Sequence, residues 1–134
     1  MNGGNTEPQV ADAQVPGRPD SASAARAFLM RLLDGWGVAE EIIDDAALLT
    51  SELMANAVRN GSGVVNLRVE LDDGVLHVDV QDDAAELPST RLGSASAPEG
   101  LPGTGLWIIK SVAQDWGSEH ADDGRTVWFE LEAM

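Results

Sequence analysis

Residues 48–61 read LLTSELMANAVRNG, and this stretch is the strongest indication of the fold. Glu52 and Asn56 stand four residues apart, so on a helix they lie on one face, with Arg59 one turn further on. The leucines beside them belong to an apolar stripe that predicts a helix packed on a core. Such a helix offers oxygen ligands for a hard cation and a carboxylate able to orient a nucleophile. On spacing alone, the solvated face of an amphipathic helix is the simpler interpretation.

The composition describes an acidic chain of 134 residues, with 8 basic and 23 acidic side chains and a net charge of −15. This length fits one domain with a single core. The charge argues against nucleic acid as a partner, because neutralisation of the phosphate backbone carries much of that affinity. It fits a soluble regulator whose partners present basic patches. The absence of cysteine excludes disulfides and thiolate metal sites and fits a reducing cytoplasm.

The first 20 residues contain three prolines and predict a flexible N-terminal segment, followed by one domain over residues 21–134. Residues 9–15 could add an edge strand to that domain. The N-terminus has no secretory signal, and no apolar run approaches the length of a membrane span. We therefore expect a cytoplasmic protein without membrane contact.

Beyond residue 20 the apolar spacing follows first a helical period and then a period of two. The helical part predicts two helices, over residues 21–35 and 39–60. The alternating part predicts a hairpin, with strands at residues 65–71 and 76–81 around the turn Asp72-Asp73-Gly74.

The remaining chain predicts a long loop, a third helix and a second hairpin. Residues 83–103 are mainly Ala, Ser, Pro and Gly, and a loop of about twenty residues in a compact domain is functional or disordered. The third helix opens at Thr104 and carries apolar side chains as far as Trp116. The last hairpin joins residues 117–120 to residues 126–131. The whole order predicts an α+β two-layer sandwich, with three helices on one face of a mostly antiparallel sheet.

Two further segments suit a nucleotide. Asp82 ends a strand, where its carboxylate can accept a hydrogen bond from the exocyclic amine of adenine, although turn chemistry before a loop explains it as well. The bend GLPGTGL at residues 100–106 runs into a helix, so its backbone amides can approach phosphates. The long loop before this bend would then form a lid over the phosphates.

Taken in order, these motifs resemble those of the GHKL (Bergerat-fold) ATPases. SELMANAVRNG (51–61) is similar to the N-box of that family, and VDVQDD (78–83) to its first glycine-box region. GLPGTGLWIIKSVAQDWG (100–117) is similar to its second glycine box. The resemblance covers about residues 20–131 and is closest to the small stand-alone anti-sigma-factor serine/threonine kinases of actinobacteria, including the terminal strand TVWFEL (126–131).

The resemblance implies a role for each candidate residue. Glu52 would be the general base for the acceptor hydroxyl, and Asn56 would coordinate Mg²⁺ bound to ATP. Asp82 would bind the adenine amine, with Asp83 as the competing candidate. The remaining implied contacts are to phosphate or to the acceptor, from Gly103, Thr104, Gly105, Leu106, Arg59 and Lys110.

The resemblance implies an ATP-dependent protein kinase that regulates transcription by partner switching. It would bind a sigma factor in one state and phosphorylate a STAS-type anti-anti-sigma protein in another; it also allows a homodimer. The sequence departs from the family where Asp82-Asp83-Ala84-Ala85 replaces the first glycine box and has no glycine. That departure favours the alternative, a non-catalytic nucleotide-binding module that sequesters a partner. A detached catalytic domain acting on a separate phosphoacceptor protein is a third interpretation.

Other residues take simpler interpretations. His77 and His120 lie in strand-like segments away from any context typical of a phosphoacceptor. We expect the four tryptophans to pack in the core and between helices and sheet. Asp44 and Asp45 predict a solvated helix face.

Overall fold

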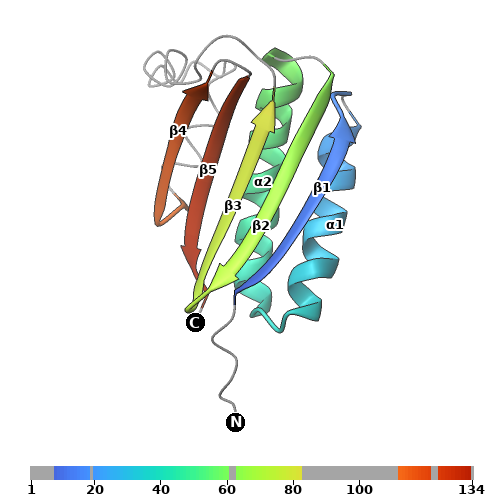
Figure 1. The fold of residues 1–134 in the computed structure, drawn as a ribbon. Helices are drawn as coiled ribbons and strands as arrows, with labels where there is room; N and C mark the ends of the chain where they lie inside the picture. Colours follow the sequence, from blue (N-terminus) through green and yellow to red (C-terminus); the bar gives the residue numbers. More distant parts are fainter. Residues whose placement is uncertain (1–7, 19, 61–62, 83–111, 122–123, 134) are drawn as a thin grey trace.

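In the described part of the chain, the fold is a two-layer sandwich in which two helices cover one face of a five-stranded antiparallel sheet (Figure 1). The structure is a computed structural model and describes residues 8–133 except 19, 61–62, 83–111 and 122–123. The architecture confirms the predicted α+β fold. The predicted loop and nearly all of the predicted third helix fall outside the described residues.

Helices α1 (Ser21–Gly35) and α2 (Glu40–Asn60) match the two predicted helices and pack against each other. Their apolar stripes face the sheet, as helical spacing requires. Gly37 ends α1 with a φ of 80°, a backbone conformation that glycine adopts without strain. Its amide donates to the carbonyl of Asp34, and the amide of Val38 donates to that of Leu33. This pairing is a Schellman motif, which satisfies the last carbonyls of the helix.

The sheet has the strand order β1-β2-β3-β5-β4, and every neighbouring pair is antiparallel. Its strands are β1 (Gln9–Pro16), β2 (Val64–Asp72), β3 (Val75–Asp82), β4 (Asp115–Ala121) and β5 (Gly124–Glu132). The edge strand that residues 9–15 could add is thus present as β1. The turn between β2 and β3 lies at Asp73 and Gly74, which both have positive φ, as a tight hairpin turn requires.

The core lies between the sheet and the two helices. Alternate residues of the central strands point into it, which is the reason for the period of two in the sequence. The largest fully buried side chains are Phe129, Leu29, Leu33, Leu49, Leu53, Met54, Leu67, Leu76 and Val69. Among the described residues, no helix is long and apolar enough to cross a membrane.

Two tryptophan predictions were wrong. Trp116 was expected on the third helix, but β4 already begins at Asp115, and Trp116 pairs with Phe129 of β5 and packs against the core. Spacing at three and four residues was compatible with a helix there, but pairing with β5 decides the structure. Trp128 was expected in the core, yet it lies between the buried Val127 and Phe129 and therefore points to the face of the sheet opposite α1 and α2.

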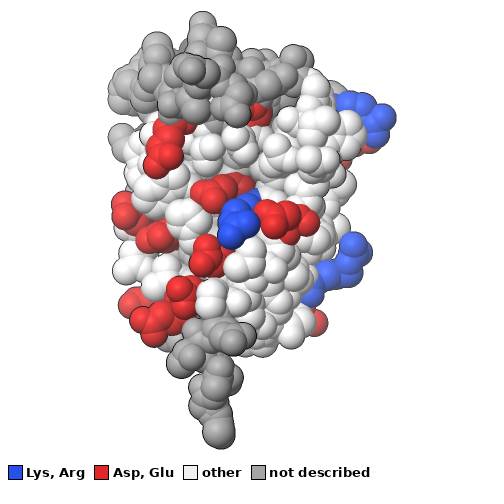
Figure 2. All heavy atoms as spheres, viewed as in Figure 1, with Lys and Arg blue, Asp and Glu red and all other residues white. Residues whose placement is uncertain are grey.

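The face of the sheet opposite α1 and α2, called the open face below, is acidic. Figure 2 looks onto it and shows carboxylates around a small basic area. The register brings carboxylates from all five strands to this face, at Asp12, Glu70, Asp72, Asp79, Asp115, Glu119, Glu130 and Glu132. Arg68 lies on the same face.

Gly117 is required where β4 passes Trp128. A Cβ at residue 117 would lie 2.7 Å from Cζ2 of Trp128, closer than carbon atoms pack. We expect Gly117→Ala to destabilise the fold by about 1–3 kcal/mol, because the indole must leave its place. Urea unfolding measures this loss, and the double variant Gly117→Ala/Trp128→Ala should recover part of it. An unchanged unfolding midpoint in Gly117→Ala would contradict this packing.

Candidate functional site

The candidate site lies at one end of the sandwich, where α2 and β3 both finish. Figure 1 shows the two elements running in the same direction and ending at the same end of the molecule. They also pack against each other across the core. The topology therefore brings the end of α2, at Asn60, and Asp82 to one end of the fold, although 22 positions separate these residues in the sequence.

Glu52 lies on α2 at the border between core and solvent. Its side chain is half-buried, whereas Leu53 and Met54, which follow it, are fully buried. A carboxylate in this position remains open to a substrate and is held on a helix fixed by the core. Of Asn56 and Arg59, the structure describes the helical backbone only, which puts them one and about two turns beyond Glu52.

Asp82 is the last residue of β3 and is only 5% exposed. Its side chain follows Leu76, Val78 and Val80 on the helix-covered face of the sheet. Burial of a carboxylate is costly unless donors surround it. A carboxylate accepts several hydrogen bonds, so Asp82, which has an interaction within the chain, can in addition accept one from a ligand N–H such as the exocyclic amine of adenine.

Two hydroxyl groups next to Glu52 were not singled out in the sequence. Thr50 Oγ1 and Ser51 Oγ are buried and have no hydrogen-bond partner within the described part of the chain. A buried polar atom left unpaired costs about 1–3 kcal/mol, so such groups fit a polar ligand or chain segment beside this helix. The sequence offered one indication of them, because Thr50 and Ser51 directly precede Glu52.

The other predicted contacts are those to phosphate, to the acceptor and, for Asp83, to adenine. Gly103, Thr104, Gly105, Leu106 and Lys110 lie outside the described residues, as does the competing candidate Asp83. Within the described ranges, no three His, Asp or Glu side chains form a group able to hold a metal ion. The structure therefore places the end of α2 and Asp82 at the same end of the fold, and the contacts to nucleotide and phosphate stay predictions.

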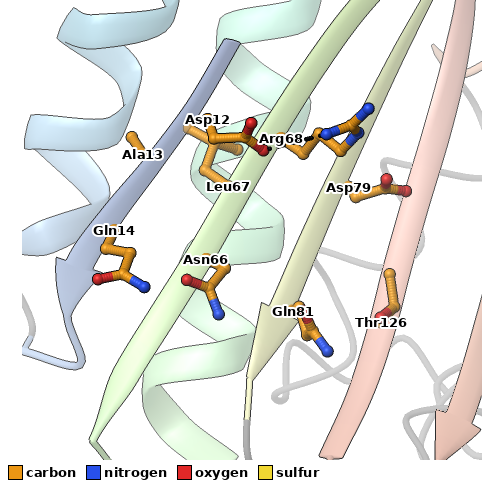
Figure 3. A pocket seen from close by; sticks show the side chains of 9 residues that line it. All are labelled: Asp12, Ala13, Gln14, Asn66, Leu67, Arg68, Asp79, Gln81 and Thr126. Atoms are coloured by element: carbon orange, nitrogen blue, oxygen red, sulfur yellow. Dashed lines mark hydrogen bonds and ion pairs between the residues drawn. The ribbon is translucent and has the colours of Figure 1, made fainter. Parts of the chain in front are cut away.

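A separate hollow of about 640 Å³ lies on the open face, across β1, β2 and β3 (Figure 3). It is lined mainly by polar side chains, and Arg68 crosses it with Nη1 3.4 Å from Oδ1 of Asp12. Both of these side chains are about half exposed or more, so solvent weakens their attraction. The hollow lies on the opposite face of the sheet from Asp82 and does not belong to the candidate site.

The comparison with models of protein families shows which family the chain belongs to. Residues 15–131 match the family described as the histidine kinase-like ATPase domain. The chain belongs to this family. The predicted resemblance to GHKL ATPases is thereby confirmed, and nucleotide binding is the function that an ATPase domain implies.

Solved structures agree on the fold. A crystal structure of the RsbU and RsbW domains of a Mycobacterium tuberculosis protein is 20% identical with a TM-score of 0.71, covering 92% of this chain and 32% of that one. The histidine kinase domain of a blue-light activated histidine kinase from Erythrobacter litoralis is 20% identical with a TM-score of 0.57, covering 89% of this chain and 62% of that one. Our chain thus spans less than two thirds of either. No protein of curated function matches its sequence.

Proposed function

We propose that this chain binds Mg-ATP between the second half of α2 and the end of β3, and transfers the γ-phosphoryl group to a serine or threonine of a partner protein. The observation that carries the proposal is that α2, which holds a half-buried Glu52, packs against β3, which ends at the buried Asp82, and that both elements finish at the same end of the fold. Membership of a family of ATPase domains supports it.

In this proposal each end of the nucleotide has its own ligands. Asp82 accepts a hydrogen bond from the adenine amine. The amides of residues 103–106 hold phosphate oxygens, with Arg59 and Lys110 as further contacts. Asn56 holds Mg²⁺, a cation that prefers oxygen ligands such as an amide carbonyl. When bound, Mg²⁺ supplies positive charge that offsets the repulsion between phosphates and a chain of net charge −15.

Glu52 acts as the general base. It takes the proton of the acceptor hydroxyl while that oxygen forms a bond to the γ-phosphorus. The bond between the γ-phosphorus and the oxygen bridging to the β-phosphate breaks, and ADP leaves. The products are a phosphoester on the partner and ADP. The partial exposure of Glu52 favours this role, because the hydroxyl of a whole protein must reach it.

The proposed partners are a sigma factor and a STAS-type anti-anti-sigma protein, in the cytoplasm. The resemblance to anti-sigma-factor kinases supports this choice, and so does the similarity in fold to a chain that carries RsbU and RsbW domains. The acidic surface fits partners that present basic patches (Figure 2).

A non-catalytic module that sequesters its partner is the second candidate. The observation in its favour is Asp82-Asp83-Ala84-Ala85, which lacks the glycines that allow a backbone to approach the base closely. In that case the chain would bind nucleotide and partner without transferring phosphate.

Phosphate transfer tests the proposal directly. The full chain is incubated with ATP labelled in the γ-phosphate, Mg²⁺ and a panel of STAS-domain proteins. We expect label on a serine or threonine of one of them. Binding of ATP and of a STAS protein without any label would favour the sequestering module. Label on a histidine of the partner would indicate a catalytic domain acting in trans.

A further inference from the structure

A cluster of ionisable groups lies on the open face of the sheet, on the opposite side from the candidate ATP site. His77 of β3 is at its centre, between two carboxylates. Its Nδ1 lies 2.9 Å from Oε2 of Glu130 in β5, and its Nε2 lies 2.8 Å from Oδ1 of Asp79 in β3. All three side chains are about a quarter to a third exposed, so the cluster is neither fully solvated nor fully enclosed.

The geometry of the cluster indicates the protonation state of His77. Carboxylates only accept hydrogen bonds, whereas a neutral imidazole carries one N–H and one lone pair. Each ring nitrogen has a carboxylate oxygen at hydrogen-bond distance. A neutral His77 can donate to only one of these carboxylates, and the lone pair of its other nitrogen then faces the second carboxylate. The imidazolium donates to both. The arrangement therefore fits the protonated ring.

The imidazole of His77 also has an aromatic contact on one face. It stacks on the indole of Trp128, with the ring centroids 5.2 Å apart and the planes 22° from parallel. Trp128 in turn lies against the backbone of Gly117 in β4. The imidazole is thus fixed between β3 and β5 by two hydrogen bonds and one aromatic contact, and this packing continues to β4.

The charges around the cluster are mainly negative. From β2, Glu70 pairs with His77 and Arg68 pairs with Asp79. The other charged residues of the described strands that share this face are Asp72 of β2, Glu132 of β5, Asp115 and Glu119 of β4, and Asp12 of β1, which pairs with Arg68. If His77 lost its proton, the nearest cation to Glu70, Asp79 and Glu130 on the described strands would be Arg68.

We propose that His77 is a proton-controlled clasp between β3 and β5, which fixes the open face while the imidazole is protonated and loosens it when the proton is lost. The clasp is independent of nucleotide, because it lies on the face opposite Asp82. It would make the order and the charge of this face respond to pH.

The pKa of His77 agrees with this geometry. Burial alone would lower it, but the hydrogen bonds of Glu130 and Asp79 and the charges of both carboxylates outweigh burial and raise the pKa above 6.5. A group whose pKa is raised on folding adds stability below its unfolded value, and this stability is lost as the pH rises through the folded value. We therefore expect the clasp to stabilise the fold at pH 6 and to weaken as the pH rises above 6.5.

The test is an NMR titration of the imidazole Cε1–H from pH 5 to 9 in the full chain. The variant His120→Gln leaves His77 as the single histidine. We expect a midpoint above 6.5 that falls in Asp79→Asn and in Glu130→Gln. Glu119→Gln is the matched control, since it removes one exposed carboxylate from the same face without touching the ring, and its midpoint should stay closer to that of the parent. A midpoint at or below 6.5, or equal midpoints in all three carboxylate variants, would overturn the clasp.

Unfolding by urea gives a second readout. The difference in midpoint between the parent chain and His77→Gln should be largest at pH 6 and shrink as the pH passes the midpoint of His77. In His120→Gln the difference from the parent should not follow that titration. If the His77→Gln difference is the same at pH 6 and pH 9, proton control is wrong.

Discussion

Replacing Glu52 by alanine is expected to lower phosphate transfer to a partner by roughly 10²–10⁴-fold, the usual contribution of a general base. Binding of Mg-ATP should persist, because the proposed adenine contact at Asp82 and the proposed phosphate contacts at residues 103–106 do not involve Glu52. The half-buried position of Glu52 on α2 predicts little loss of stability. Labelled transfer and equilibrium ATP binding, measured on the same preparation, check both parts.

Two variants sharpen this test. Glu52→Gln keeps the shape of the side chain and removes its basicity, so it should be as inactive as Glu52→Ala. Glu41→Ala removes an exposed carboxylate from the first turn of the same helix and should leave transfer intact. Undiminished transfer in Glu52→Ala would disprove the role of Glu52 as the base.

Replacing Phe129 by alanine should have the largest effect on stability, a loss of about 3–5 kcal/mol. Phe129 is fully buried in β5, and its neighbours across the strands are Val78 of β3 and Trp116 of β4. Truncation leaves a cavity in the core next to β5, where the paired strands on both sides limit relaxation. Urea unfolding of the chain without nucleotide measures the loss.

Thr126→Ala is a suitable control for Phe129, because it lies in the same strand with its side chain on the open face. We expect it to change the free energy of unfolding by less than about 1 kcal/mol. A comparable loss in both variants would mean that the core does not extend across β5 as described.

Much of the fold was predictable because local patterns coincide with tertiary packing. The helical period of residues 21–60 and the alternation in β2 and β3 each report one buried face. The segment around Trp116 was predicted as helix because the spacing of its apolar residues carries no information about its pairing with β5. For Trp128, the alternation with Val127 and Phe129 was available, but the size of the side chain suggested a core position.

The candidate site was predictable in part for a related reason. Asp82 stands where a strand ends and a polar segment follows, and Glu52 stands on a helix face with Asn56, so local sequence patterns were enough to suggest both residues. The His77 cluster depends on the register between β3 and β5, which joins residues 53 positions apart. No local sequence pattern encodes that register, so the contact between His77 and Glu130 could not be predicted from the sequence.

The central claim is that Mg-ATP binds at the end of the fold where Asp82 lies. Calorimetric titration of Mg-ATP into the parent chain and into Asp82→Asn tests it most directly. We expect saturable binding of one nucleotide per chain, weakened at least about tenfold in Asp82→Asn, since a hydrogen bond to a buried charged group contributes about 1.5–3 kcal/mol. Circular dichroism would verify that the variant is folded. No binding of millimolar Mg-ATP by the folded parent, or equal affinity in Asp82→Asn, would contradict the claim.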